Sequence, residues 1–82
     1  MSRTRDLVEV VARALADERD SVVVKEKERS DGTRVEVSVA AGDLGKLIGR
    51  QGRTAAAVRA LASASAELEG RRAIVDFLDG RE

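Results

Sequence analysis

The residues best placed for chemistry in this sequence are glycines and cations gathered in one short stretch. Residues 45–53 read GKLIGRQGR, so three glycines and three basic residues share nine positions. Glycine in such a place indicates positive φ or a backbone that something approaches closely. Lysine and arginine offer hydrogen-bond donors that suit phosphate. The combination points to phosphate binding.

Candidate catalytic and metal-binding residues are absent or scattered. The 82 residues include no Cys and no His, which excludes disulfides, thiolate ligands and the commonest catalytic base. Ser63 and Ser65 therefore have no imidazole to activate them, and the acidic residues are spread as on a solvated surface. The glycine spacing matches neither a Walker loop nor a dinucleotide-binding fingerprint. We predict a protein that is not an enzyme and has no cofactor or metal.

Charge is distributed unevenly along the chain. Fifteen basic and fifteen acidic residues give a net charge of zero, yet residues 44–66 contain no acid. The location of charge matters more than its total for the choice of partner. A neutral average therefore conceals a basic patch that suits nucleic acid. Its members are Lys46, Arg50, Arg53 and Arg59.

Two helices should flank the glycines. Asp43 is placed to cap a short helix over 44–48, and the Ala-rich segment 53–68 has high intrinsic helix propensity. Helical spacing predicts one buried stripe on the long helix. This stripe consists of Val58, Leu61, Ala62, Ser65 and Leu68.

The turn between these helices has features of an anion site. Gly49 can end the short helix in a left-handed conformation, and Gly52 would open the long helix without a Cβ over its amides. The N–H groups of residues 50–53 would then face outward at the positive end of a helix dipole, which favours phosphate. A G-x-x-G spacing alone is more often a plain tight turn, and basic residues alone are more often a solvated face. Their coincidence favours phosphate binding.

The remaining segments supply the scaffold. A first helix should start with Thr4 as its cap and end before Asp17. Alternation and β-branched residues predict strands at 21–29, 33–39 and 72–78. Ser30-Asp31-Gly32 marks a hairpin turn. A two-residue loop could place Lys27 opposite Glu36 but also Arg29 opposite Arg34, an unfavourable pair, so a longer loop or a bulge is an alternative.

The order of elements is therefore α-β-β-α-α-β, an α+β fold. A hairpin followed by a two-helix connection predicts a three-stranded mixed sheet with three helices on one face. The last strand would lie parallel to a central strand that buries Val35, Val37 and Val39. We expect a single domain over 1–82, with a core at about 5–78 and a polar tail at 79–82. No apolar run approaches the length of a membrane span, and the first residues do not resemble a signal peptide.

The glycine stretch resembles the signature of the KH domain, I-G-x-x-G-x-x-I, with Ala55 where the pattern usually has Ile. The element order is that of the type II, prokaryotic form. The whole chain is similar to the small bacterial single-KH proteins of the KhpA/YlqC family. Residues shared with the family pattern are Asp43, Gly45, Lys46, Ile48, Gly49, Gly52, Arg53, Thr54 and Arg59.

This resemblance implies recognition of single-stranded RNA, with the G-x-x-G loop clamping the backbone of about four nucleotides. Gly49, Arg50, Gln51 and Gly52 would hold phosphates. The residues implied to complete the RNA-binding site are Lys46, Ile48, Arg53 and Arg59. The resemblance also implies a cytoplasmic setting, self-association, and pairing with a KH–R3H partner of the KhpB type. An RNA-chaperone role linked to cell-wall homeostasis and cell shape would follow.

Two other functions stay open from the residues alone. Single-stranded DNA is an alternative ligand, because phosphate clamping does not distinguish the two sugars. A protein–protein interaction module is the other alternative, because small residues surround much of the long helix and could allow close helix docking. These residues are Ala56, Ala57, Ala60, Ser63 and Ala64. The thin aliphatic core independently favours dimerisation.

Overall fold

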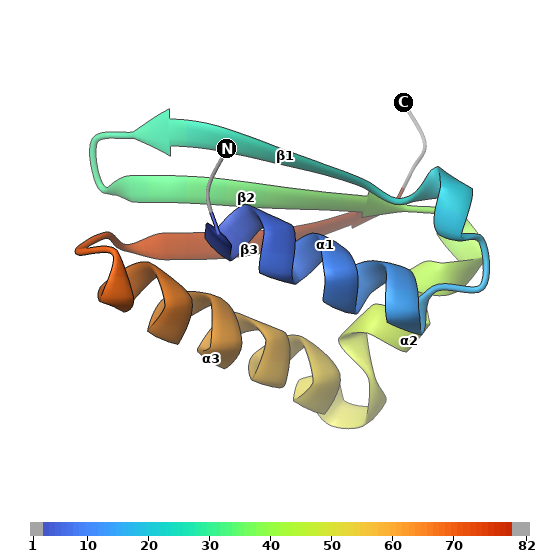
Figure 1. The fold of residues 1–82 in the computed structure, drawn as a ribbon. Coiled ribbons are helices and arrows are strands. Elements are labelled where there is room, and N and C mark those ends of the chain that lie inside the picture. The colour runs from blue at the N-terminus through green and yellow to red at the C-terminus, as the bar shows by residue number, and fades with distance from the viewer. Residues whose placement is uncertain (1–2, 80–82) are drawn as a thin grey trace.

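The computed structural model describes residues 3–79, which form the predicted order α-β-β-α-α-β (Figure 1). The principal elements are α1 (Arg3–Leu15), β1 (Val23–Arg29), β2 (Gly32–Val39), α2 (Leu44–Ile48), α3 (Arg53–Leu68) and β3 (Ala73–Asp79). Short 3₁₀ turns lie at η1 (Arg19–Ser21), η2 (Ala41–Asp43) and η3 (Arg50–Gly52). The predicted polar tail lies outside the described residues from position 80 onward, and Asp79 closes β3.

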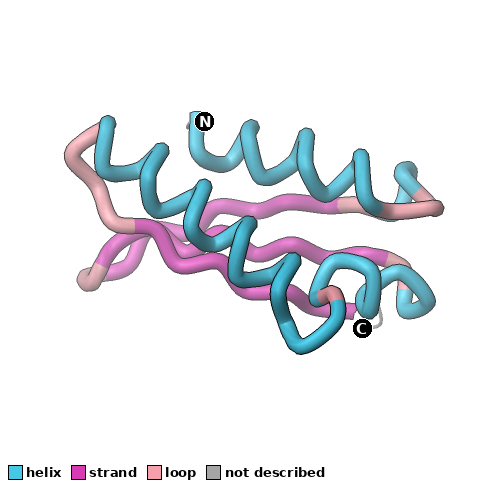
Figure 2. The backbone as a smooth tube through the Cα atoms, turned by 90° about the horizontal axis from the view of Figure 1, so that it is seen from below, coloured by secondary structure: helices cyan, strands magenta, loops and turns pink. Residues whose placement is uncertain are grey.

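The three strands form one mixed sheet with β2 in the centre. β1 pairs with β2 antiparallel, and β3 pairs with β2 parallel, with Val35 opposite Val75. The three α-helices cover one face of this sheet (Figure 2). The predicted fold class and the parallel orientation of the last strand are confirmed.

The core lies between the sheet and the helices. Side chains alternate along β2, so Val35, Val37 and Val39 are fully buried while the intervening side chains face away from the helices. The buried apolar cluster contains Val8, Ala12, Ala16, Val22, Val24, Val35, Val37, Val39, Leu47, Ala62 and Val75. The predicted burial of Val35, Val37 and Val39 is confirmed, and the cluster consists of seven valines, three alanines and Leu47.

The hairpin register differs from the one considered above. The loop has two residues, Ser30 and Asp31, and Arg29 lies opposite Gly32 instead of Arg34. A shift by two residues keeps every side chain on its own face and separates the two arginines. Gly32 has a φ of +135°, and a Cβ there would lie 2.7 Å from the carbonyl oxygen of Arg72. Glycine begins β2 because the chain entering β3 passes so close.

Thr4 does not cap α1. It lies within the first turn of the helix, buried, with its hydroxyl 2.9 Å from the hydroxyl of Ser65 on α3. The two hydroxyl groups can satisfy each other, so the interface between α1 and α3 accommodates a polar pair. Thr4 therefore links two helices that are distant in sequence.

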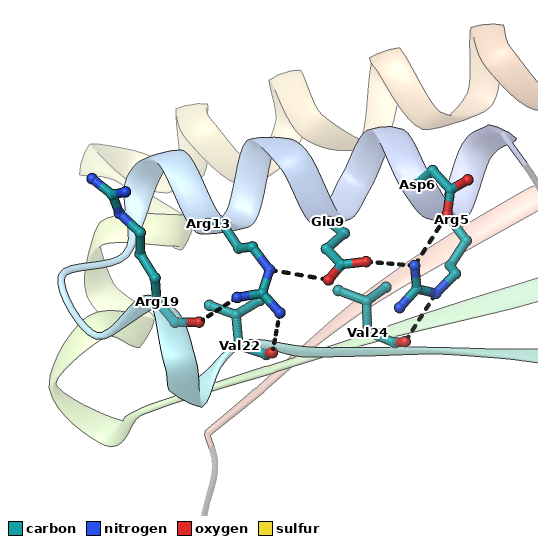
Figure 3. A network of polar contacts seen from close by, with 7 residues as sticks. All are labelled: Arg5, Asp6, Glu9, Arg13, Arg19, Val22 and Val24. Atoms are coloured by element: carbon teal, nitrogen blue, oxygen red, sulfur yellow. Dashed lines mark hydrogen bonds and ion pairs between the residues drawn. The ribbon is translucent and has the colours of Figure 1, made fainter.

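Arginines of α1 reach over the edge strand β1 (Figure 3). The Nε of Arg5 donates to the carbonyl oxygen of Val24 at 3.2 Å, and Arg13 donates to the carbonyl oxygen of Arg19 at 2.9 Å and to that of Val22 at 3.5 Å. The carboxylate of Glu9 lies between the two guanidinium groups. Hydrogen bonds from Arg13 and Arg5 hold the pKa of the Glu9 carboxyl group below its usual value. This network fixes α1 on β1.

The predicted buried stripe of α3 is partly wrong. Val58 and Ala62 are buried, but Leu61 is 51% exposed and Leu68 is 90% exposed. The side of α3 that faces the sheet has mostly small side chains, so the helix can lie close to the sheet. Leu61 and Leu68 are on the other side of the helix and point away from the core. The residues that α3 buries are Ala55, Val58, Ala62 and Ala66.

Candidate nucleic-acid interface

The G-x-x-G turn joins α2 to α3 at the end of the molecule opposite the β1–β2 hairpin loop (Figure 1). Its predicted flanking helices are confirmed at 44–48 and 53–68. The turn therefore projects from the edge of the helical layer.

Three of the four turn residues have positive φ. Gly49 has φ 77° and ψ 171°, while Gln51 (φ 57°, ψ 23°) and Gly52 (φ 73°, ψ 14°) are left-handed. The predicted left-handed conformation of Gly49 is wrong, since its extended ψ places it in a region almost restricted to glycine. Gln51 is the one non-glycine residue in the described part of the chain with positive φ.

The two signature glycines are required for different reasons. A Cβ on Gly49 would lie 2.3 Å from Oγ1 and 2.9 Å from the backbone nitrogen of Thr54, so the first turn of α3 packs directly on this glycine. A Cβ on Gly52 would meet no atom within 4 Å. Gly49 is therefore needed both for packing and for its backbone angles, whereas Gly52 is needed only for its backbone angle and leaves an open surface.

The amide groups of the turn are only partly available to a ligand. The N–H of Gly52 donates to the carbonyl oxygen of Gly49 at 3.1 Å, and the N–H of Arg53 donates to that of Arg50. The expectation that all N–H groups of residues 50–53 face outward is thus wrong for two of them. Arg50 and Gln51 carry the candidate backbone donors of the loop.

The predicted cations fall into two groups. Arg50 and Arg53 are exposed, and neither has an ion-pair partner within residues 3–79. Lys46, by contrast, forms an ion pair with Asp17, and this hydrogen bond raises the pKa of the lysine above its usual value. Arg50 and Arg53 therefore place positive charge without an ion-pair partner at the start of α3, within the part of the chain that the structure describes.

Arg59 lies on the side of α3 that faces β3. Its Nε donates to the carbonyl oxygen of Val75 at 3.2 Å, and its guanidinium carbon lies 5.2 Å from the centroid of the Phe77 ring. This distance is within the range of a cation–π contact. Arg59 thus connects α3 to the edge strand β3, a role that the sequence analysis did not predict.

Two residues beside the turn help to set its position. Asp43 precedes α2, but its buried carboxylate accepts a hydrogen bond from the N–H of Glu18 at 2.9 Å instead of capping the helix. The half-buried Ile48 ends α2, and Ala55 is buried in the first turn of α3. Ala55, which stands where the KH pattern usually has Ile, is therefore part of the buried side of α3.

Together, the fold and the glycine turn between α2 and α3 define a type II KH domain. Residues 5–77 match the family model described as the KH domain of KhpA and KhpB, and the chain belongs to this family.

Similar proteins span almost the whole chain. It is 43% identical to RNA-binding protein KhpA of Halalkalibacterium halodurans over 92% of this chain and 99% of that protein. The protein of the same name from Mycobacterium leprae is 46% identical, with 90% and 89% covered. The one from Aquifex aeolicus is 38% identical, with 96% and 100% covered.

A solved structure also has this fold. A crystal structure of Aquifex aeolicus Era bound to GDP and aluminium fluoride superposes with a TM-score of 0.67 at 23% identity. The match covers 93% of this chain and only 29% of that one. It shows that the same fold occurs within a larger protein.

Proposed function

We propose that this chain binds single-stranded RNA by clamping its backbone with the loop Gly49–Gly52. The observation that carries the proposal is this glycine turn at the start of α3, flanked by two arginines without ion-pair partners in the described part of the chain. Several similar proteins are named RNA-binding proteins, which supports this choice of ligand. A non-enzymatic role fits the same names.

The proposed clamp works through backbone access and charge. The open position at Gly52 allows a phosphate to approach the N–H groups of Arg50 and Gln51 without a side chain between them. The guanidinium groups of Arg50 and Arg53 supply charge-assisted donors on either side. Bases would then lie against Ile48 and the α3–β3 side of the domain. With few cations and no aromatic platform, affinity is weak and sequence preference is loose.

The dependence of RNA affinity on salt tests this mechanism. If only Arg50 and Arg53 contact phosphates, the slope of log K against log salt should be roughly −1.4. If Lys46 leaves its ion pair with Asp17 and contacts a third phosphate, the slope should be about −2. Fluorescence anisotropy with a uridine strand of about eight nucleotides, twice the length that one loop holds, measures the slope. DNA of equivalent sequence tests for a contribution from the 2′-OH. A lack of binding to both strands would favour the interaction-module alternative.

We also propose that the chain self-associates or pairs with a KhpB-type partner through the outer surface of α1 and α3. These helices lie side by side (Figure 1) and carry exposed apolar side chains. Val10 is 67% exposed, and Leu61 and Leu68 are the two leucines that α3 does not bury. Leu61 and Leu68 are seven positions apart and therefore lie on the same side of α3, which supports this surface as the interaction site.

Replacing Leu61 and Leu68 with Glu is expected to give a monomer that stays folded, because both side chains are already exposed. Sedimentation velocity of wild type and variant, alone and with the partner, measures the change. Val23→Glu with Leu78→Glu is the matched control, since these exposed residues lie on the uncovered face of the sheet. An unchanged sedimentation coefficient for the α3 variant would contradict the proposed interface.

Family membership supports a proposal about the wider role. We propose that the chain acts as an RNA chaperone with a KhpB-type KH–R3H protein and contributes to cell-wall homeostasis and cell shape. The matching family model includes the KH domains of both KhpA and KhpB, which supports this pairing. Within the described residues, no helix is long and apolar enough to cross a membrane.

A further inference from the structure

The sheet has an uncovered face on the side opposite the helices (Figure 2). Its side chains belong to alternate residues of the three strands, and the register arranges them in rows across the sheet. Two of these rows lie next to the hairpin loop. The first is Lys27–Arg34–Ile74. In the second, Arg29 pairs with Gly32, and Arg72, the residue directly before β3, lies beside Gly32.

Positive charge dominates the end of this face near the hairpin. The two rows contain four cations and no acid, and the nearby loop adds Asp31. Glu36 and Asp76 lie in the next row, where they pair with Lys27 at 3.4 Å and with Arg34 at 2.9 Å. The acids of this face are therefore already engaged by two of the four cations.

The other two cations, Arg29 and Arg72, are exposed and have no ion-pair partner within residues 3–79. Gly32 separates them in the row, so bare backbone lies between two arginines about 10 Å apart at two strand spacings. A Cβ on Gly32 would lie 3.1 Å from the Cβ of Arg72, which places the base of the Arg72 side chain beside this glycine. The arrangement suits a phosphate group bound from both sides.

We propose that this surface, defined by Lys27, Arg29, Arg34 and Arg72, is a second contact for the phosphodiester backbone of single-stranded RNA. The inference rests on the proposed function, because it extends the path of the same ligand. The four residues contain no aromatic ring, so contact is with the backbone and is independent of sequence. The surface lies at the hairpin end of the molecule and the G-x-x-G loop lies at the opposite end (Figure 1), and the central strand β2 spans roughly 26 Å. An RNA segment that fills the loop alone does not reach both sites.

The test compares two variants with the same change in net charge. Arg29→Glu with Arg72→Glu alters the proposed surface, and Arg3→Glu with Arg19→Glu alters two exposed arginines elsewhere. Anisotropy titrations over a salt series use uridine strands of about eight nucleotides and of about 30 nucleotides, the second exceeding a typical single-strand site. Circular dichroism confirms that both variants are folded. Gly52→Asp, tested on both strands, reports separately on the loop.

For the long strand, we expect the surface variant to bind about tenfold more weakly than the control variant, with a salt slope smaller by about 1.4. The short strand should bind both variants equally, and Arg29→Lys with Arg72→Lys should restore the slope. Equal affinities of surface and control variants for the long strand would overturn the proposal. The proposal would also be overturned if the surface variant lost binding to an acidic partner protein but kept its affinity for the long strand. That result would assign the surface to protein contact. Wild-type binding of the short strand by Gly52→Asp would instead refute the loop clamp.

Discussion

Gly52→Asp is expected to abolish binding of short RNA while leaving the domain folded. The new side chain enters open space, since a Cβ at this position meets no atom within 4 Å. Its backbone cost at a φ of +73° is about 1–2 kcal/mol, and an acidic group at the start of α3 recovers part of this through the helix dipole. The carboxylate would repel the phosphate that the loop is proposed to hold. Affinity should fall at least about 100-fold, because placing like charges next to each other costs several kcal/mol.

Gly70→Asp is the matched control for this variant. Gly70 follows α3, has a φ of +69°, and also leaves open space for a Cβ. It imposes the same backbone strain and charge change at the opposite end of the same helix. Anisotropy measures affinity, and circular dichroism and thermal melting measure folding. Similar RNA affinities for the two variants would remove the basis for the clamp.

Gly49→Ala should destabilise the whole domain. The added Cβ would contact both the hydroxyl and the backbone nitrogen of Thr54, so relief requires a shift of α3 itself. Backbone strain of about 1–3 kcal/mol adds to an overpacking cost of about 1–3 kcal/mol. Urea unfolding should therefore show a loss of about 2–6 kcal/mol in the free energy of unfolding, a large part of the stability of a small domain.

Gly52→Ala provides the comparison, because it has the strain of positive φ without the contact, and should cost only about 1–2 kcal/mol. Equal losses for the two alanine variants would show that α3 can move away from Gly49 freely. The difference between Gly49 and Gly52 also determines which variant tests the clamp. A variant with Asp at both positions would lose its fold as well as its RNA binding, so the clamp is tested with Gly52→Asp alone.

Local signals in the sequence were sufficient for the arrangement of elements. Alternating valines identified β2, and glycines with alanine-rich spacing identified α2 and α3 with the bounds that the structure shows. The two-helix connection then predicted the parallel orientation of β3. Each of these inferences depends on residues close together along the chain.

The features that sequence analysis missed depend on distant residues. Thr4 pairs with Ser65, and Asp43 accepts a hydrogen bond from Glu18, so neither residue performs the capping role that its local context favours. Leu61 fits a helical stripe, but the small residues of α3 face the sheet instead. At the candidate site, the partner of Lys46 lies 29 positions away. Helical spacing and propensity contain no information about such partners.

The arginines that reach the borders of the sheet also limit how copies of this protein can assemble. A strand at an open border can recruit a strand from another molecule, which leads to ribbons and fibrils. Here Arg5 occupies a carbonyl group of β1, Arg13 occupies that of Val22 just before the strand, and Arg59 occupies one on β3. An incoming strand would have to displace these guanidinium groups to continue the ladder. We therefore expect the sheet to end at three strands even at high protein concentration.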